Sequence, residues 1–276
     1  MSIDAVPPED ADAAAKRLQE LTEKIASAPK RVDYVFGRAT LLRNIGQFHK
    51  AIEDFTKVLE LEPGHRSALV MRGEAHRKVG NEEQAIADYT RALFIDPADL
   101  EAYLVRGQAN IFQGHYEDAV SDFTKALDLV PRSVPALMGR AEGLRLLGRY
   151  EEASTDVRVA LAIEPENDAV MVLQAKIHMS AGNLEQASRL LELCVRNMGN
   201  EVEGDKVPIL VDALVTQGEV HRLASRYEQS LADFTKALEL DGDCVPALSG
   251  RSETYRVMQN MDGALADAKR VLELEL

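Results

Sequence analysis

At 276 residues, the chain is long enough for one or two compact domains or for one elongated array. It holds 46 acidic residues against 32 lysines and arginines, so its formal net charge is −14, and no block of basic residues stands out. An acidic chain repels phosphate groups, which argues against binding to nucleic acid or to anionic membranes. No run of about 18 apolar residues occurs, so membrane insertion is not expected.

Cysteine usage and the N-terminal residues indicate the compartment. Cys194 and Cys244 are too few for a disulfide framework. Residues 1–10 are acidic and contain prolines, without the apolar core of a signal peptide or the arginines of a transit sequence. These features predict an intracellular, cytoplasmic protein.

The first predicted element is a helix within residues 1–31, which we expect to form a tail followed by one helix from Pro8 to Ala28. Apolar side chains recur there at helical spacing and so share one face. The residues of this face are Ala14, Leu18, Leu21 and Ile25. We interpret the helix as a cap on the array that follows.

From Val32 onward, the chain repeats itself every 34 residues. The spacing is kept by the glycines Gly46, Gly80, Gly114, Gly148 and Gly182 and by the prolines Pro63, Pro97, Pro131 and Pro165. In this register, repeats one to seven begin at Val32, Arg66, Leu100, Val134, Asp168, Val211 and Val245. A fixed period of this length indicates a helical repeat array.

Each repeat has the pattern of two short amphipathic helices. Small residues recur at the eighth and twentieth places, where they would let two helices approach closely. Larger apolar residues follow at the twenty-fourth place, namely Phe55, Tyr89, Phe123, Val157, Leu191 and Phe234. The glycine suits the left-handed end of the first helix, and the proline stops the second helix.

These positions together resemble the tetratricopeptide repeat family, most completely in residues 66–99 and 100–133. The resemblance covers about nine-tenths of the chain, from Val32 to Leu276. It implies an all-α fold: a right-handed α-solenoid of seven two-helix units with an N-terminal capping helix. It also implies a non-catalytic scaffold or adaptor that binds an extended peptide or helix of another protein in its concave groove.

Two departures from the pattern affect the predicted domain organisation. Repeat five lacks the proline, and residues 200–210 break the phase. We therefore divide the one continuous domain into residues 32–199 (repeats one to five), an insertion at 200–210, and residues 211–276 (repeats six and seven). The last repeat has Gln259 in place of the glycine and no polar capping helix after it, so we expect its outer face to pack on something else, with self-association as one option.

Two charged rows recur in step with the repeat. Arginine occupies the seventh place in five repeats, and aspartate the twenty-third place in six. Repeat five has Gln174 and Leu190 instead, and this shared absence predicts structural ion pairs within a hairpin or between neighbours. The predicted ion-pair residues are Arg38, Asp54, Arg72, Asp88, Arg106, Asp122, Arg140, Asp156, Arg251 and Asp267.

The second row lies on the first helices. Glu-x-x-Arg occurs in four repeats, and such a pair contributes about 0.2–0.5 kcal/mol in an isolated helix. The resemblance implies that these places face the groove, where a polar ladder could also bind a ligand. The candidate groove residues are Arg43, Glu74, Arg77, Gln108, Glu142, Arg145, Lys176, Glu219, Arg222, Glu253 and Arg256.

Residues typical of catalysis or metal binding do not cluster in the sequence. Glycine-rich phosphate loops and the HExxH, CxxC and GxSxG motifs are missing, so we expect neither enzymatic activity nor a cofactor. His76, His178 and His221 occupy the same place in three different repeats and cannot converge on one metal ion. Cys194 stands where other repeats have alanine, which indicates a small buried side chain.

The resemblance leaves alternatives for the function. One is a co-chaperone, but the carboxylate clamp of chaperone-binding members is not matched, because repeats one to three offer Phe36, Thr40, Met71, Glu101 and Val105 at its places. A J-domain signature is also missing. Another is RNA binding by pentatricopeptide-type repeats, which would require a 35-residue period and a basic groove. The leading hypothesis remains a protein-binding adaptor.

Overall fold

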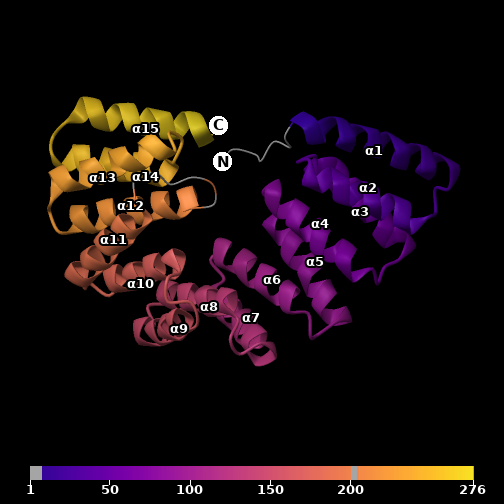
Figure 1. Ribbon diagram of the computed structural model, residues 1–276, viewed down its shortest axis with the longest axis horizontal. Helices are drawn as coiled ribbons and strands as arrows, with labels where there is room; N and C mark the ends of the chain where they lie inside the picture. Colours follow the sequence, from indigo (N-terminus) through magenta and orange to yellow (C-terminus); the bar gives the residue numbers. More distant parts are fainter. Residues whose placement is uncertain (1–7, 200–203, 205, 276) are drawn as a thin grey trace. The chain divides into compact units, whose positions relative to one another are not determined.

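The computed structural model describes residues 8–199, 204 and 206–275, and in these residues it contains fifteen α-helices and no strand (Figure 1). The bounds are α1 Pro8–Ser27, α2 Val32–Asn44, α3 Phe48–Leu61, α4 Arg66–Lys78, α5 Glu82–Ile95, α6 Leu100–Phe112, α7 Tyr116–Leu129, α8 Val134–Leu146, α9 Tyr150–Ile163, α10 Asp168–Ser180, α11 Leu184–Met198, α12 Lys206–Leu223, α13 Tyr227–Leu240, α14 Val245–Val257 and α15 Met261–Glu275. The predicted all-α repeat solenoid is confirmed. No helix in the described residues is both long and apolar enough to span a bilayer.

Helices α2 to α15 are the first and second helices of the seven repeats in turn, from α2 and α3 in repeat one to α14 and α15 in repeat seven. One residue in the short turn between the two helices has positive φ in every repeat. In repeats one to five it is a glycine with φ between 76° and 81°. Ser225 and Gln259 take the same place in repeats six and seven, with φ of 59° and 61°. These two residues adopt the left-handed backbone conformation, which costs about 1–2 kcal/mol for a residue with a Cβ.

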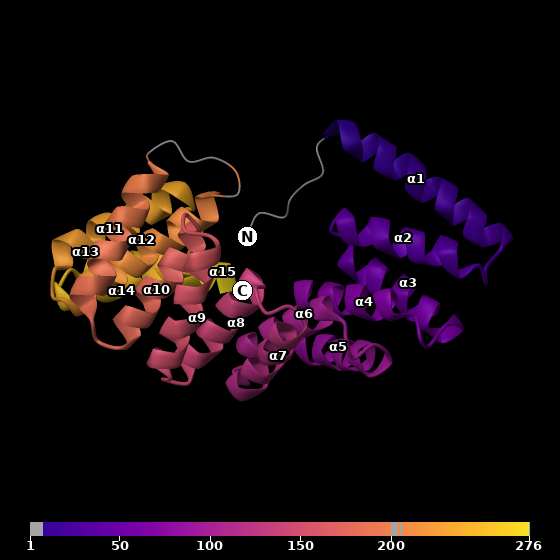
Figure 2. The same ribbon diagram turned by 60° about the horizontal axis from the view of Figure 1, so that its bottom comes forward.

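The N-terminal helix α1 lies against α2, as both views show (Figures 1 and 2). Leu21 and Ile25 are buried, and Leu18 packs against the same core. The helix thus covers the apolar face of repeat one. The tail predicted at residues 1–7 lies outside the described residues.

The predicted insertion is described only in part. Residues 200–203 and 205 lie outside the described residues, whereas residues 206–210 belong to α12, which begins at Lys206 rather than at Val211. Leu210 is buried, so the added turn of α12 joins the core.

Internal contacts divide the chain into two compact units, Met1–Gly139 and Arg140–Leu276. The boundary falls inside α8 and not at the phase break after repeat five. The division into five and two repeats that the sequence suggested stays a prediction. Each unit is described below by itself.

The core of each unit is built from the large side chain at the twenty-fourth place. Phe123 packs on Gly107 of its own first helix and on Gly139 of the next first helix, where an added Cβ would lie 2.8 Å and 2.3 Å from its ring. Phe234 packs in the same way between Gly218 and Gly250. The small eighth residue therefore makes room for a ring that joins three helices. The matching small residue at the sixth place was not singled out from the sequence.

Candidate interaction surfaces

The first helices form one face of each unit. In residues 1–139, α2 contacts α4 and α4 contacts α6; in residues 140–276, α10 contacts α12 and α12 contacts α14. We call this the first-helix face. The second helices lie on the other side, which we call the second-helix side. The candidate groove residues belong to the first helices and the aspartate row to the second.

The arginine row and the aspartate row meet within the hairpins of repeats one to four and seven. In repeat three, Arg106 Nε donates to Asp122 Oδ2 at 2.9 Å and Arg106 Nη2 donates to Asp122 Oδ1 at 2.6 Å. Four other repeats have the same two-bond pair, namely Arg38–Asp54, Arg72–Asp88, Arg140–Asp156 and Arg251–Asp267. The aspartates are nearly buried. Such charged, forked pairs fix the crossing of two helices.

Repeat six keeps the aspartate but not the arginine. Its seventh residue is Gln217, and Asp233 Oδ2 lies 2.6 Å from His221 Nδ1 instead. Burial raises the pKa of Asp233 above its ordinary value, and Glu192 raises it further, while the bond from His221 and the charge of Lys236 oppose the shift. The sequence had indicated only that His221 does not share a metal site with His76 and His178. Repeat six has the aspartate of the row without its arginine, and this difference in the sequence was the signal that Asp233 has another partner.

In residues 140–276, most of the candidate groove residues form ion pairs or hydrogen bonds with one another or with residues of the next first helix. Glu142 and Arg145 form the predicted pair, as do Glu219 and Arg222, and Glu253 and Arg256. Further bonds join successive first helices: Arg145 donates to Ser180, Lys176 to Asp212, and Arg222 pairs with Glu253. These side chains thus connect neighbouring repeats along the first-helix face.

The ladder of residues 1–139 differs from the expectation. The predicted Glu74–Arg77 pair is not formed, because Arg43 of the preceding repeat binds Glu74. Arg77 Nε lies 3.4 Å from Glu82 Oε2 instead. Glu82 is buried next to Tyr89, whose hydroxyl has no hydrogen-bond partner among the described residues. Burial raises the pKa of the Tyr89 phenol well above its ordinary value, against the opposing effect of Arg77.

The ladder is interrupted in repeat three. Its ninth and thirteenth places hold Gln108 and Phe112 on α6, and both side chains are exposed, Phe112 by 71%. Ser180 shares the place of Phe112 and binds Arg145, which assigns this position to the first-helix face. Phe94, on the second helix α5, is 90% exposed and is not part of this face. Repeat three therefore presents an uncharged spot with one exposed aromatic ring on the first-helix face of residues 1–139.

Other groups with chemical potential lie apart from one another. In the described part of the chain, no group of three or more His, Cys, Asp or Glu side chains could hold a metal ion. Cys194 is fully buried and its thiol points at the Asp168 carbonyl and carboxylate. Burial, with a smaller effect of Asp168, raises the pKa of the Cys194 thiol to about 11. Such a thiol is a poor nucleophile at neutral pH.

Comparison with known sequences and structures gives the family. Models of the tetratricopeptide repeat match residues 36–99 and 104–169, and a second model of that repeat matches residues 147–197. Together these matches cover more than half of the chain. No curated protein sequence matches it.

Several solved structures have the same fold. A tetratricopeptide repeat protein from Parabacteroides merdae has a TM-score of 0.74 at 20% sequence identity, over 89% of this chain and 93% of that one. Yeast Tom70 has a TM-score of 0.70 at 19% identity, over 98% of this chain and 57% of that one. One chain of the Cut9–Hcn1 hetero-tetramer of the APC/C has a TM-score of 0.66 at 13% identity, over 93% of this chain and 49% of that one. At these identities the likeness concerns the fold alone.

Tetratricopeptide repeats generally mediate protein–protein interaction, and the family is typically a non-catalytic scaffold. The sequence matches, the seven helix pairs and the fold shared with solved repeat proteins show that the chain belongs to the tetratricopeptide repeat family.

Proposed function

We propose that the chain is a non-catalytic adaptor that binds an extended peptide or a helix of another protein on the first-helix face, with repeat three as the main docking point. The observation that carries the proposal is the exposed pair Gln108 and Phe112 on α6. An exposed aromatic side chain on a binding face supplies affinity, and a neighbouring amide can bond the backbone of a ligand.

The ladder residues have a supporting part in this proposal. Arg43, Arg145 and Arg222 are engaged with neighbouring repeats, so they hold the first helices together before a ligand arrives. Within residues 1–139, the Arg43–Glu74 pair belongs to the helices before the docking point rather than to the docking point itself, and rim charges affect association rate more than affinity. The cytoplasmic location and the co-chaperone alternative stay predictions.

Selection of peptides from a randomised display library on the immobilised chain tests this function. Burial of a phenyl ring contributes about 1.5–3 kcal/mol, so Phe112→Ser should weaken the selected peptides about tenfold or more. Gln108→Ala should weaken them less. Phe94→Ser is the matched control, because it removes a still more exposed phenyl ring from the second-helix side, and it should leave affinity unchanged.

Two outcomes would contradict the proposal. One is a selection that yields no binding peptide from the folded chain. The other is a set of peptides that bind Phe112→Ser as tightly as the unmodified chain.

Combined replacement of Arg77, Arg145 and Arg222 by glutamine distinguishes the contribution of the ladder arginines to affinity from that of the docking point. With fold retained by circular dichroism, this triple variant should weaken binding less than Phe112→Ser alone.

A further inference from the structure

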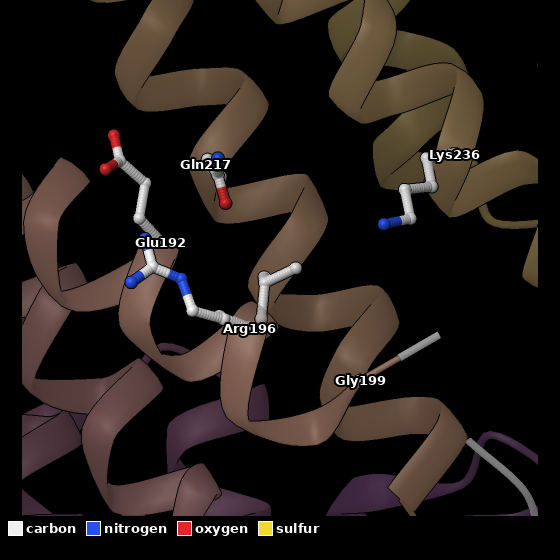
Figure 3. A pocket seen from close by; sticks show the side chains of 6 residues that line it. Glu192, Arg196, Gly199, Gln217 and Lys236 are labelled. Atoms are coloured by element: carbon white, nitrogen blue, oxygen red, sulfur yellow. The ribbon is translucent and has the colours of Figure 1, made fainter. Parts of the chain in front are cut away.

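A cavity of about 410 Å³ opens on the second-helix side of repeats five and six. Figure 3 shows Gln217 of α12 between Glu192 of α11 and Lys236 of α13, with Arg196 nearby. Val195 and Gly199 complete its lining. None of these residues is a candidate groove residue, and the docking point proposed above is on α6, so the cavity is a separate site.

The equivalent place is filled by an arginine side chain in other repeats. There the seventh-place arginine bonds Asp through Nε and Nη2, and its Nη1 donates to a threonine of the preceding second helix or of α1. These Nη1–Oγ1 distances are 3.3 Å for Arg38–Thr22, 2.9 Å for Arg72–Thr56, 3.1 Å for Arg106–Thr90 and 3.2 Å for Arg251–Thr235. One guanidinium thus joins three helices.

In repeat six, the acceptors are present but the guanidinium is not. Glu192 stands in the place of the threonine, Gln217 in the place of the arginine, and Asp233 is retained. The Oε1 atom of Gln217 is buried and has no hydrogen-bond partner among the described residues. A buried acceptor without a donor is destabilising, so this site gains from a ligand that supplies N–H groups.

Lys236 and His221 do not exclude a guanidinium from this site. Lys236 has a basic counterpart in repeats one, two, three and seven, all of which hold the arginine: Lys57, Arg91, Lys125 and Arg270. His221 bonds Asp233 Oδ2, but Asn110 bonds Asp122 Oδ2 at 3.1 Å while Arg106 binds the same carboxylate. Repeat three therefore shows that one aspartate can serve both partners.

We propose that this cavity binds a guanidinium group from outside the chain, in the place that the repeat's own arginine takes elsewhere. Glu192 and Gln217 Oε1, which line the cavity, accept hydrogen bonds from its N–H groups. A planar guanidinium can bond several acceptors at once, which an ammonium group cannot do as well. The group comes from an arginine side chain of a protein partner or from a small guanidino compound.

A titration followed by heteronuclear NMR of the full chain tests this site. The probes are the peptide Gly-Gly-Arg-Gly-Gly, its counterpart with lysine, and methylguanidine. The arginine peptide should shift the backbone amide signals of the lining residues Glu192 and Lys236 in a saturable manner, and the lysine peptide should bind at least several-fold more weakly. Tighter binding of the peptide than of methylguanidine indicates a protein source, and the reverse order indicates a small compound.

Two variants keep the test falsifiable. Gln217→Arg supplies the guanidinium internally and should abolish the saturable shifts, whereas Glu192→Gln, an exposed and conservative change, should weaken binding about two- to fivefold. The matched control is Glu239→Gln, an exposed acidic residue on α13 outside the lining, which should have no effect. Equal binding of the two peptides, unchanged binding by Gln217→Arg, or no saturable shift would each overturn the proposal.

Discussion

Repeats three and six have the same two-helix architecture, but they differ in which side chains have hydrogen-bond or ion-pair partners. In repeat three, Arg106, Asn110 and Asp122 form a complete polar network on the second-helix side. In repeat six, Gln217 and His221 replace the first two, and Gln217 Oε1 is left without a partner. An arginine therefore bridges the two helices of repeat three, whereas no arginine occupies this place in repeat six.

The first-helix face shows the opposite contrast. Repeat six has Glu219 and Arg222 there, paired with each other and with the next repeat. Repeat three has Gln108 and Phe112, which make no such pairs and stay exposed. The comparison teaches that the repeat pattern specifies the fold, and that departures from the pattern leave individual side chains exposed or without a partner in the described residues.

The largest expected effect comes from removing the arginine of repeat three, which gives this repeat the glutamine that repeat six has. Arg106→Gln leaves Asp122 nearly buried with Asn110 as its remaining partner. Removal of one partner from such a pair should lower the free energy of unfolding by about 2–3 kcal/mol, measured by urea titration. Lys125→Gln, in the exposed Lys125–Asp128 pair, is the control and should change it by less than about 0.5 kcal/mol. Equal effects of the two would show that the buried pair does not support the hairpin.

Cys194 tests whether α11 stays packed behind the open cavity. A thiol pKa of about 11 leaves very little thiolate at pH 8, so alkylation should be at least about 100-fold slower than in the urea-unfolded chain. Because the folded thiol ionises only toward its raised pKa, the rate should rise about tenfold for each pH unit between 7 and 9. Mass spectrometry of iodoacetamide-treated protein gives the rate for each cysteine. Rapid labelling of Cys194 in the folded chain would show that this junction opens readily.

The helix ends offer a smaller and reciprocal comparison. Ser225 holds φ at 59° in repeat six, whereas Gly114 holds the equivalent place in repeat three at 78°. Ser225→Gly should raise the free energy of unfolding by about 1 kcal/mol, and Gly114→Ser should lower it by a similar amount. Thermal and urea unfolding of both variants measure the pair. A loss of stability in Ser225→Gly would mean that the serine side chain contributes contacts that outweigh its backbone cost.

Most of the fold could be predicted from the sequence because the same residue pattern occurs in seven copies. Seven copies place each helix start, and first helices begin at Val32, Arg66, Leu100, Val134 and Asp168 as the register indicates. The start of α12 at Lys206 could not be read in the same way, since the insertion has no counterpart in the other repeats. The arginine and aspartate rows were visible for the same reason of repetition.

The site depended instead on departures from the repeat, and these were harder to interpret. Glu74 and Arg77 have the spacing of a helix pair, but Arg43 from the neighbouring repeat competes for Glu74, and spacing within one helix carries no information on that contact. Exposure of Phe112 and the orphaned oxygen of Gln217 are properties of packing between helices. Only the structure reveals them.

The central claim, that repeat six keeps open the place of an arginine, is tested most directly by the stability of Gln217→Arg. The new guanidinium should gain charged hydrogen bonds and raise the free energy of unfolding by about 1–2 kcal/mol, as measured by urea titration. Most of that gain should vanish when the substitution is made together with Asp233→Asn, because the carboxylate partner is then missing. A neutral or destabilising effect of Gln217→Arg, or a gain that persists with Asp233→Asn, would contradict the claim.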